Sequence, residues 1–435
     1  QLTIEKRAFA SISQELVIGL GSNPLGEFQA KPVGSQYVFY VTEFMSGQAV
    51  VKAEAVSGEA SALSDVEGKV VLAVDTAELE DSATVDIEIL ADGYRVEKVS
   101  LMANNKEAQS VQLVPNRPHV FVSKRSGVYD VYAIDIDGKN ERKIVSGSGF
   151  ERNDIALVSH MSKNKVAYIA TRENIRNSNG YLLSTLYLVD VDSQDIVKVD
   201  QSERIKIIGW TSSGRLVYVK MTAGGSGPMA DRHILMSVNT EDYSEKSIEL
   251  ANSNYFNDVI MVGDTAYYAL SNFYNEEDQP GVYAVKVSGG DSKRIVEEEV
   301  YSIVRTSYDT LHFSANNQWY EYVAGSPMAG MVNPPSNQDS KLYIDGTNDT
   351  FSLWVDNRDG KGVLLSYDKA TDHEKQLTAL AGLGYPIYWL DSDTVVYRVA
   401  DSRETADYVI STKGGETRKI VDVTASSGIA SWNYY

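Results

Sequence analysis

The side chains best suited to acid–base or metal chemistry are spread thinly along this chain of 435 residues. There is no cysteine, which excludes thiolate nucleophiles, zinc–thiolate sites and disulfide bonds. The five histidines are His119, His160, His233, His312 and His373. No two of them have the spacing of a His-x-x-x-His metal motif. Ordinary strand and turn positions explain them more simply than a funnel that gathers them from distant segments.

Aspartates occur in pairs at several expected turns, namely Asp135 with Asp137, Asp190 with Asp192, Asp356 with Asp359, and Asp391 with Asp393. A calcium loop needs several oxygen ligands at fixed spacing, as in Asp-x-Asp-x-Asp-Gly, and no pair completes that pattern. Aspartate also caps hairpin turns through its side-chain oxygens. We therefore predict turn capping at these positions and assign no metal site.

The sequence contains no motif of nucleophilic catalysis or of phosphate binding. No Gly-x-Ser-x-Gly nucleophile elbow occurs. The glycine-rich stretch 223–228 lacks the following helix and the Lys-Ser or Lys-Thr pair of a phosphate cradle, so it is predicted to be a loop. The sequence therefore assigns no catalytic, cofactor-binding or metal-binding residue, and it predicts a protein that is not an enzyme.

The formal net charge of −20 and the isoelectric point of about 4.7 indicate an acidic surface. Such a surface repels nucleic acid and anionic membranes unless a basic patch intervenes, and the basic clusters hold only two charges each. No stretch reaches the roughly 18 apolar residues that a membrane helix needs. We expect neither a nucleic acid partner nor membrane contact by these residues. Because the chain begins with Gln1, a signal peptide or an N-terminal anchor could precede it.

The elements that must position these side chains are β-strands, because short apolar–polar alternations are separated by Gly, Asn, Asp and Ser turns. From Pro118 onward the pattern repeats, most clearly in Val120–Gly138 followed by Arg142–Val145. Its second hairpin recurs in six further copies, at residues 186–192, 234–239, 282–290, 319–323, 363–368 and 408–415. Another hairpin precedes each of these copies, as in Trp210–Tyr218. Each full unit therefore has four strands, which is typical of a propeller blade.

The first repeat lacks its innermost strand, whereas the C-terminal segment Gly428–Tyr434 has a strand-like sequence without a partner. We predict that this tail completes the first blade and closes the ring, which leaves few free sheet edges. The predicted fold class is all-β, with a seven-bladed β-propeller in residues 118–435. Aromatic residues on or beside the inner hairpins are expected to pack between blades, and they are Tyr168, Trp210, Tyr218, Tyr267, Trp354 and Tyr397.

Residues 1–113 do not share the repeat. Alternating strands are predicted at residues 48–55, 69–74, 83–90 and 95–101, and residues 2–43 are expected to add further strands to the same sheets. We predict a small β-sandwich domain in residues 1–113. The boundary is expected between Asn104 and Pro118, where Asn, Gln and two prolines cluster.

Two segments resemble known families. Val120–Gly138 resembles the TolB-type, WD-repeat-like motif of an apolar strand, Ser-Asp-Arg-x-Gly, Asp-Ile-Tyr and an Asp-Gly turn, with Lys124 in place of the usual acidic residue. That resemblance implies a periplasmic or surface propeller that binds other proteins. Ser64–Leu72, with Ala91–Tyr94 after it, is similar to carboxypeptidase-regulatory-like and Ig-like sandwiches. That similarity implies a structural spacer on an extracytoplasmic protein.

The leading hypothesis is a non-enzymatic binding or scaffold protein of the bacterial cell envelope, whose propeller face engages a protein or glycan partner. Its expected location is extracytoplasmic, at the cell surface or in the periplasm. Two alternatives stay open: a propeller enzyme, either a lyase or a glycan hydrolase with a funnel active site, and a structural component of a surface layer.

Overall fold

A computed structural model of the chain contains β-strands, turns and loops in the residues that it describes. These residues are 1–5, 9–17, 19–22, 26–31, 33–76, 79–80, 82–152, 155–222, 232–241, 247–271, 279–307, 309–333, 341–344, 350–402, 404–413 and 415–423. None of these ranges contains a helix with the length and apolar character needed to cross a membrane. The chain divides into two units, of which the first comprises Gln1–Asn116 and the second starts at Arg117.

Two sheets share one apolar core in the first unit. One sheet has the order β6-β3-β9, formed by β6 (Lys69–Val74), β3 (Ser35–Glu43) and β9 (Gln109–Leu113), with β9 parallel to β3. The other has the order β5-β4-β7-β8, formed by β5 (Ala60–Leu63), β4 (Glu54–Ser57), β7 (Thr84–Leu90) and β8 (Glu97–Met102). Because side chains alternate along a strand, Tyr37 and Phe39 of β3 meet Ile87 and Ile89 of β7 in this core. The unit is therefore a β-sandwich.

Two predictions for this unit were wrong in detail. The strand expected at residues 48–55 begins only at Glu54. The reason is local, because the hydroxyl of Ser64 accepts a hydrogen bond from the Ala53 amide and donates one to the Val50 carbonyl. Backbone groups bonded to a side chain in this way do not continue the ladder. In addition, residues 2–43 extend the sandwich only through β3, because β1 (Leu2–Ile4) and β2 (Ile12–Gln14) pair with each other in a separate sheet.

The described part of the second unit forms seven antiparallel sheets in chain order, which we number from first to seventh. The first has three strands, β10 (His119–Ser123), β11 (Asp130–Ile134) and β12 (Arg142–Val145). The others have four strands: β13 Ala156–Ser159, β14 Lys165–Ala170, β15 Ser184–Asp190 and β16 Ile196–Ser202; β17 Arg204–Trp210, β18 Arg215–Thr222, β19 Arg232–Asn239 and β20 Ile248–Ser253; β21 Asp258–Val262, β22 Thr265–Leu270, β23 Gly281–Lys286 and β24 Lys293–Val296; β25 Ile303–Arg305, β26 Thr310–Ala315, β27 Gln318–Val323 and β28 Gly330–Val332; β29 Lys341–Ile344, β30 Phe351–Arg358, β31 Lys361–Asp368 and β32 His373–Gln376; and β33 Leu383–Trp389, β34 Thr394–Ala400, β35 Thr405–Ser411 and β36 Arg418–Asp422.

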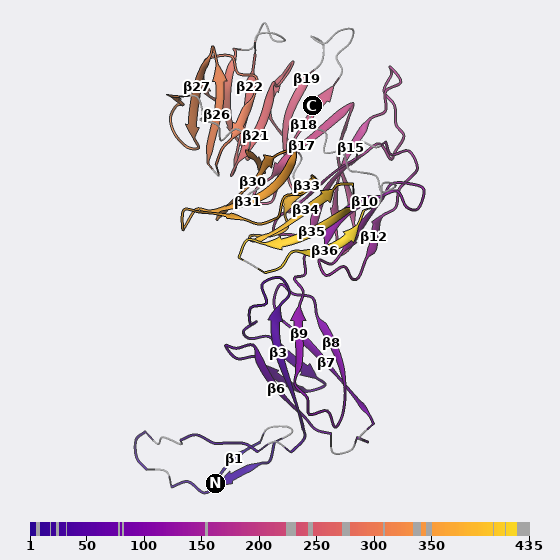
Figure 1. The fold of residues 1–435 in the computed structure, drawn as a ribbon, viewed down its shortest axis with the longest axis vertical. Helices are drawn as coiled ribbons and strands as arrows, with labels where there is room; N and C mark the ends of the chain where they lie inside the picture. Colours follow the sequence, from indigo (N-terminus) through magenta and orange to yellow (C-terminus); the bar gives the residue numbers. More distant parts are fainter. Residues whose placement is uncertain are drawn as a thin grey trace. The chain divides into compact units, whose positions relative to one another are not determined.

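The leading strands of successive sheets lie side by side, with β13 next to β17, β17 next to β21, and β21 next to β25. Figure 1 shows β17 beside β21. Buried apolar clusters join the first sheet to the second, the second to the third, and so on to the fifth, and another joins the sixth to the seventh. Four-stranded meanders that stack face to face around their leading strands form a β-propeller. The all-β propeller fold predicted from the repeat is therefore confirmed.

Three predictions concern segments outside the described residues. They are the closing strand at Gly428–Tyr434, the loop at residues 223–228, and the turn of the hairpin expected at residues 345–351. The seven-bladed closed ring depends on the first of these segments and so stays a prediction.

Packing of aromatic residues between sheets is confirmed for five of the six predicted residues, Tyr168, Trp210, Tyr218, Tyr267 and Tyr397, which belong to buried clusters that join two sheets. Trp354 is only partly buried and belongs to none of these clusters. The structure adds a cross-strand pattern, because Tyr168 faces Tyr187 in the second sheet. Equivalent rings stack in other sheets, as Phe121 with Tyr132, Tyr268 with Tyr283, and Tyr397 with Tyr408. Such pairs stabilise the contact between the second and third strands of a sheet.

Candidate functional site

The histidines do not converge on one site. His119, His160 and His233 are at most 4% exposed and belong to or directly follow strands of three different sheets. His312 lies on β26 and contacts Glu321 on β27, with 2.9 Å between its Nε2 and a carboxylate oxygen. His373 is the exposed first residue of β32.

The aspartate pairs act at turns, as predicted, in at least two cases. Asp190 accepts hydrogen bonds from the amides of Asp192 and Ser193, at 3.0 and 2.9 Å. One carboxylate oxygen of Asp391 accepts from the amides of Asp393 and Thr394, which forms the same kind of turn. Within the described ranges, no three histidine, aspartate or glutamate side chains gather as metal ligands.

One side of the propeller carries connections of very unequal length. In a four-stranded meander, the connection between the second and third strands and the connection to the next sheet emerge on the same side. Among the described connections, the former spans residues 171–183 in the second sheet, and the matching connection between β10 and β11 spans 124–129, but it spans only 316–317 in the fifth sheet and 359–360 in the sixth. We call this the long-connection side. A turn of two residues suffices to join two strands, and longer surface connections are common positions for binding residues.

The described connection at residues 171–183, which we call the hairpin arm, is held by its own side chains. The side-chain oxygen of Asn177 accepts hydrogen bonds from the amides of Asn179 and Tyr181, at 3.0 and 2.9 Å. Arg176 donates to the carbonyl of Gly180 at 2.7 Å. These bonds fix the turn locally, so the arm does not depend on a partner for its conformation.

Glu173 anchors the base of the hairpin arm to the second sheet. Its carboxylate accepts hydrogen bonds from the hydroxyl of Tyr187 at 3.0 Å and from the ammonium group of Lys198 at 2.7 Å. Burial alone would raise the pKa of Glu173, but these bonds outweigh it and hold that pKa below its usual value. The carboxylate is therefore ionised at neutral pH and pairs firmly with Lys198.

The hairpin arm and the segment before β13 present apolar side chains to solvent. Tyr181 is 66% exposed, Ile175 is 40% exposed, and Phe150 in the neighbouring segment is 53% exposed. The two segments are tied together, because Thr171 donates a hydrogen bond to the carbonyl of Phe150 at 2.8 Å. Exposed aromatic and aliphatic side chains on an ordered frame are characteristic of interaction surfaces. Sequence reasoning missed this feature, although the irregular spacing of the repeats is its signal.

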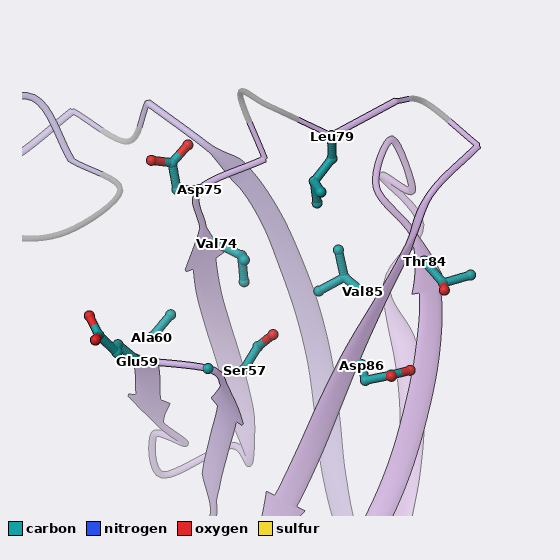
Figure 2. Close-up of a pocket in the computed structure, with 10 residues that line it drawn as sticks. Ser57, Glu59, Ala60, Val74, Asp75, Leu79, Thr84, Val85 and Asp86 are labelled. Carbon is teal, nitrogen blue, oxygen red and sulfur yellow. The ribbon is translucent and has the colours of Figure 1, made fainter.

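The first unit has a separate open pocket at one end of the sandwich, with a volume of about 270 Å³ (Figure 2). Val74, Leu79 and Val85 form its apolar wall, and Figure 2 shows the side chain of Leu79 reaching down from a connecting loop. Carboxylates of Asp75 and Asp86 lie at opposite margins and not together. Asp86 accepts a hydrogen bond from the hydroxyl of Ser100 on β8.

No protein-family model matches the chain, and no curated protein matches it. Among solved structures, the β-propeller domain of the Trilobed protease from Pyrococcus furiosus matches with 13% identity and a TM-score of 0.45, over 79% of this chain and 96% of that one. Acylaminoacyl peptidase from Pyrococcus horikoshii matches with 14% identity and a TM-score of 0.46, over 70% of this chain but only 50% of the peptidase. TolB from Acinetobacter baumannii matches with 12% identity and a TM-score of 0.35, over 78% of this chain and 79% of TolB. All three contain propellers, and the fold of this chain rests on its own strand order.

Proposed function

We propose that this chain is a non-enzymatic binding or scaffold protein that engages a protein partner through the long-connection side of its propeller. The observation that supports this proposal is the hairpin arm, a self-supporting projection that exposes Ile175 and Tyr181. Rigid apolar side chains on a preformed loop bind at low entropic cost, because little ordering is left to happen on association. A glycan is the alternative ligand, since tyrosine rings also stack on sugars.

The test compares two isoleucines of the same sheet with nearly equal exposure. Ile175 on the hairpin arm is 40% exposed, whereas Ile196 opens β16 on the opposite side of the propeller and is 41% exposed. We expect Ile175→Ser, and more strongly Ile175→Ser with Tyr181→Ser, to abolish capture of the partner from envelope extract by the full chain. Ile196→Ser should capture as the original protein does. Equal capture by all variants would refute the proposed surface, and binding to a glycan array alone would replace a protein partner by a glycan.

We further propose an extracytoplasmic location, with the first unit as a spacer of the Ig-like or carboxypeptidase-regulatory-like kind. The support is the resemblance of its turn and strand motifs together with its two-sheet core. Fractionation of cells that express the complete gene tests the location. Recovery of the protein from the cytosolic fraction would contradict it.

Catalysis is the second candidate function, and the contact between His312 and Glu321 favours it. An imidazole held by a carboxylate can act as a general base. The two side chains are 16% and 43% exposed, but Nδ1 of His312, the ring nitrogen that does not contact Glu321, is itself buried, so the pair would have to open before a substrate could reach that nitrogen. The test is the release of reducing ends from a panel of acidic oligosaccharides by the purified chain. Activity that His312→Asn removes would establish an enzyme, and an inactive original protein would leave the binding role.

A further inference from the structure

At three positions of the propeller repeat, several sheets have an aliphatic residue. The seventh sheet has a charged residue at two of these positions, and the first sheet has a histidine at the third. A β-bulge marks the equivalence, and it lies in β11 of the three-stranded first sheet and in the third strand of four other sheets. The residue before the bulge is Val131, Leu186, Leu235 and Val282 in the first four sheets, but Asp407 in the seventh. Its partner on the preceding strand is Val122, Ile169, Val219 and Ala269, but Arg398 in the seventh.

The third position lies three residues before that partner on the same strand. It holds Val166, Leu216, Ala266 and Val395 in the second, third, fourth and seventh sheets, but His119 in the first.

The three polar side chains meet in one fully buried network between the two sheets. Arg398 donates two hydrogen bonds to the carboxylate of Asp407, at 2.7 and 2.9 Å. His119 of the first sheet contacts the same carboxylate through Nε2 at 2.8 Å, and its Nδ1 lies 2.7 Å from the hydroxyl of Tyr388 on β33. His119 and Asp407 have no exposed surface, and Arg398 is 4% exposed.

The protonation pattern of this network follows from its contacts. The carboxylate of Asp407 only accepts, so Nε2 of His119 carries a proton and donates it to that carboxylate, while Nδ1 shares a hydrogen bond with the hydroxyl of Tyr388. The carboxylate then receives three hydrogen bonds, of which His119 contributes the one that comes from another sheet. Without the first sheet, the buried charge of Asp407 would lose that donor.

Aliphatic faces fit one another in many combinations, whereas a buried charge tolerates only a face that offers the right donor. The pair of Asp407 and Arg398 would meet Val166, Leu216 or Ala266 if the seventh sheet packed on any of the corresponding faces. Each of those contacts would leave a charged group without its hydrogen bond. The polar network therefore discriminates against wrong neighbours and not only in favour of the right one.

We propose that His119, Arg398 and Asp407 form a pairing key that makes closure of the propeller specific to its first and seventh sheets. In this role the network selects which sheet faces meet within one chain. It also prevents the seventh sheet of one molecule from packing on an aliphatic face of a second copy. This function concerns assembly of the fold and is independent of the ligand that the propeller binds.

The decisive variant replaces the key by the aliphatic residues of the second sheet, as His119→Val, Arg398→Ile and Asp407→Leu together. The chain has no cysteine, so Lys139→Cys in the first sheet and Ser402→Cys in the seventh allow specific fluorescent labelling. After dilution from urea, we expect the original sequence to give one narrow distribution of transfer efficiency and one species by light scattering. The triple variant should give a broad distribution and a mixture of oligomers. A single narrow distribution and a single species for the triple variant would show that the key contributes stability alone, which would overturn the proposal.

A second variant keeps the test valid if the triple variant does not refold. His119→Val removes the link between the two sheets and leaves Arg398 paired with Asp407 inside the seventh sheet. The matched control, Val166→Ala, shortens an aliphatic side chain at the equivalent position of the second sheet. We compare the two variants at conditions where each has lost the same amount of melting temperature. We expect the fraction of oligomers to increase for His119→Val but not for Val166→Ala. Equal behaviour of the two variants would refute a pairing role.

Discussion

Tyr168 and Tyr218 occupy the same position of the repeat in neighbouring sheets, and neither has exposed surface. Their hydroxyl groups differ, because that of Tyr218 donates to Asp200 at 2.8 Å while that of Tyr168 is buried and has no hydrogen-bond partner among the described residues. A buried hydroxyl without a partner costs roughly 1–3 kcal/mol, whereas a bond to a carboxylate contributes about 1.5–3 kcal/mol. We therefore expect Tyr168→Phe to leave the free energy of unfolding unchanged or to increase it, and Tyr218→Phe to decrease it. Urea unfolding measures both, and an equal loss in both variants would contradict this assignment.

Asp407 links the stability of the propeller to acid pH. Burial would raise its pKa, but the hydrogen bonds from Arg398 and His119 outweigh burial and lower the pKa to about 2. Because the folded pKa lies below that of the unfolded chain, near 3.9, the stabilisation is complete above about pH 5 and is lost as the pH falls through 2 towards 1. The difference corresponds to roughly 2–3 kcal/mol. In Asp407→Asn, which is less stable at neutral pH, this part of the pH dependence should vanish from urea unfolding midpoints. A slope as steep as that of the original protein would assign it to other carboxylates.

At the scale of single strands, a glycine is required where a neighbouring backbone segment lies too close to leave room for a Cβ atom. Gly281 and Gly330 each open a strand, β23 and β28. Gly281 has a φ of 144°, and a Cβ there would lie 2.3 Å from the carbonyl oxygen of Val296, whereas a Cβ at Gly330 would meet open space. We expect Gly281→Ala to lower the free energy of unfolding by about 2 kcal/mol or more, and Gly330→Ala to change it by less than about 0.5 kcal/mol. Thermal and urea unfolding of the two variants provide the comparison, and equal effects would show that β23 shifts to admit a side chain.

The strands themselves were largely predictable, because each has a local pattern of apolar and polar residues in the sequence. Alternation with flanking turns located β6 and β7 almost residue by residue. The strand expected at residues 48–55 was wrong because the side chain of Ser64, which lies beyond the alternating segment, binds that backbone. The cross-strand aromatic pairs were not predicted, since their partners become neighbours only once the register is fixed. Local patterns therefore predict strands, and contacts between strands require coordinates.

At the scale of the whole molecule, the repeat predicted the propeller but not the surfaces that distinguish its sheets. The hairpin arm was not predicted, because the sequence of residues 171–183 is typical of an ordinary polar turn region. The polar network was hidden for another reason, as Asp407 and His119 are 288 positions apart and each looks like an ordinary strand residue. A repeat describes what its copies share, while both features arise where one copy departs from the others.

Closure of the ring gives the last test at this scale. The first sheet has three strands in the described ranges, whereas each sheet after it has four. If residues 428–435 supply the missing strand, their deletion exposes the edge of β10, and the melting temperature should fall by roughly 5 °C or more. Amide hydrogens of Val120 and Val122 should then exchange faster with solvent. Deletion of residues 1–14, whose strands pair only with each other in the described part of the chain, is the control and should leave the propeller transition in place. An unchanged transition and unchanged exchange at β10 after removal of the tail would mean that another segment covers this edge.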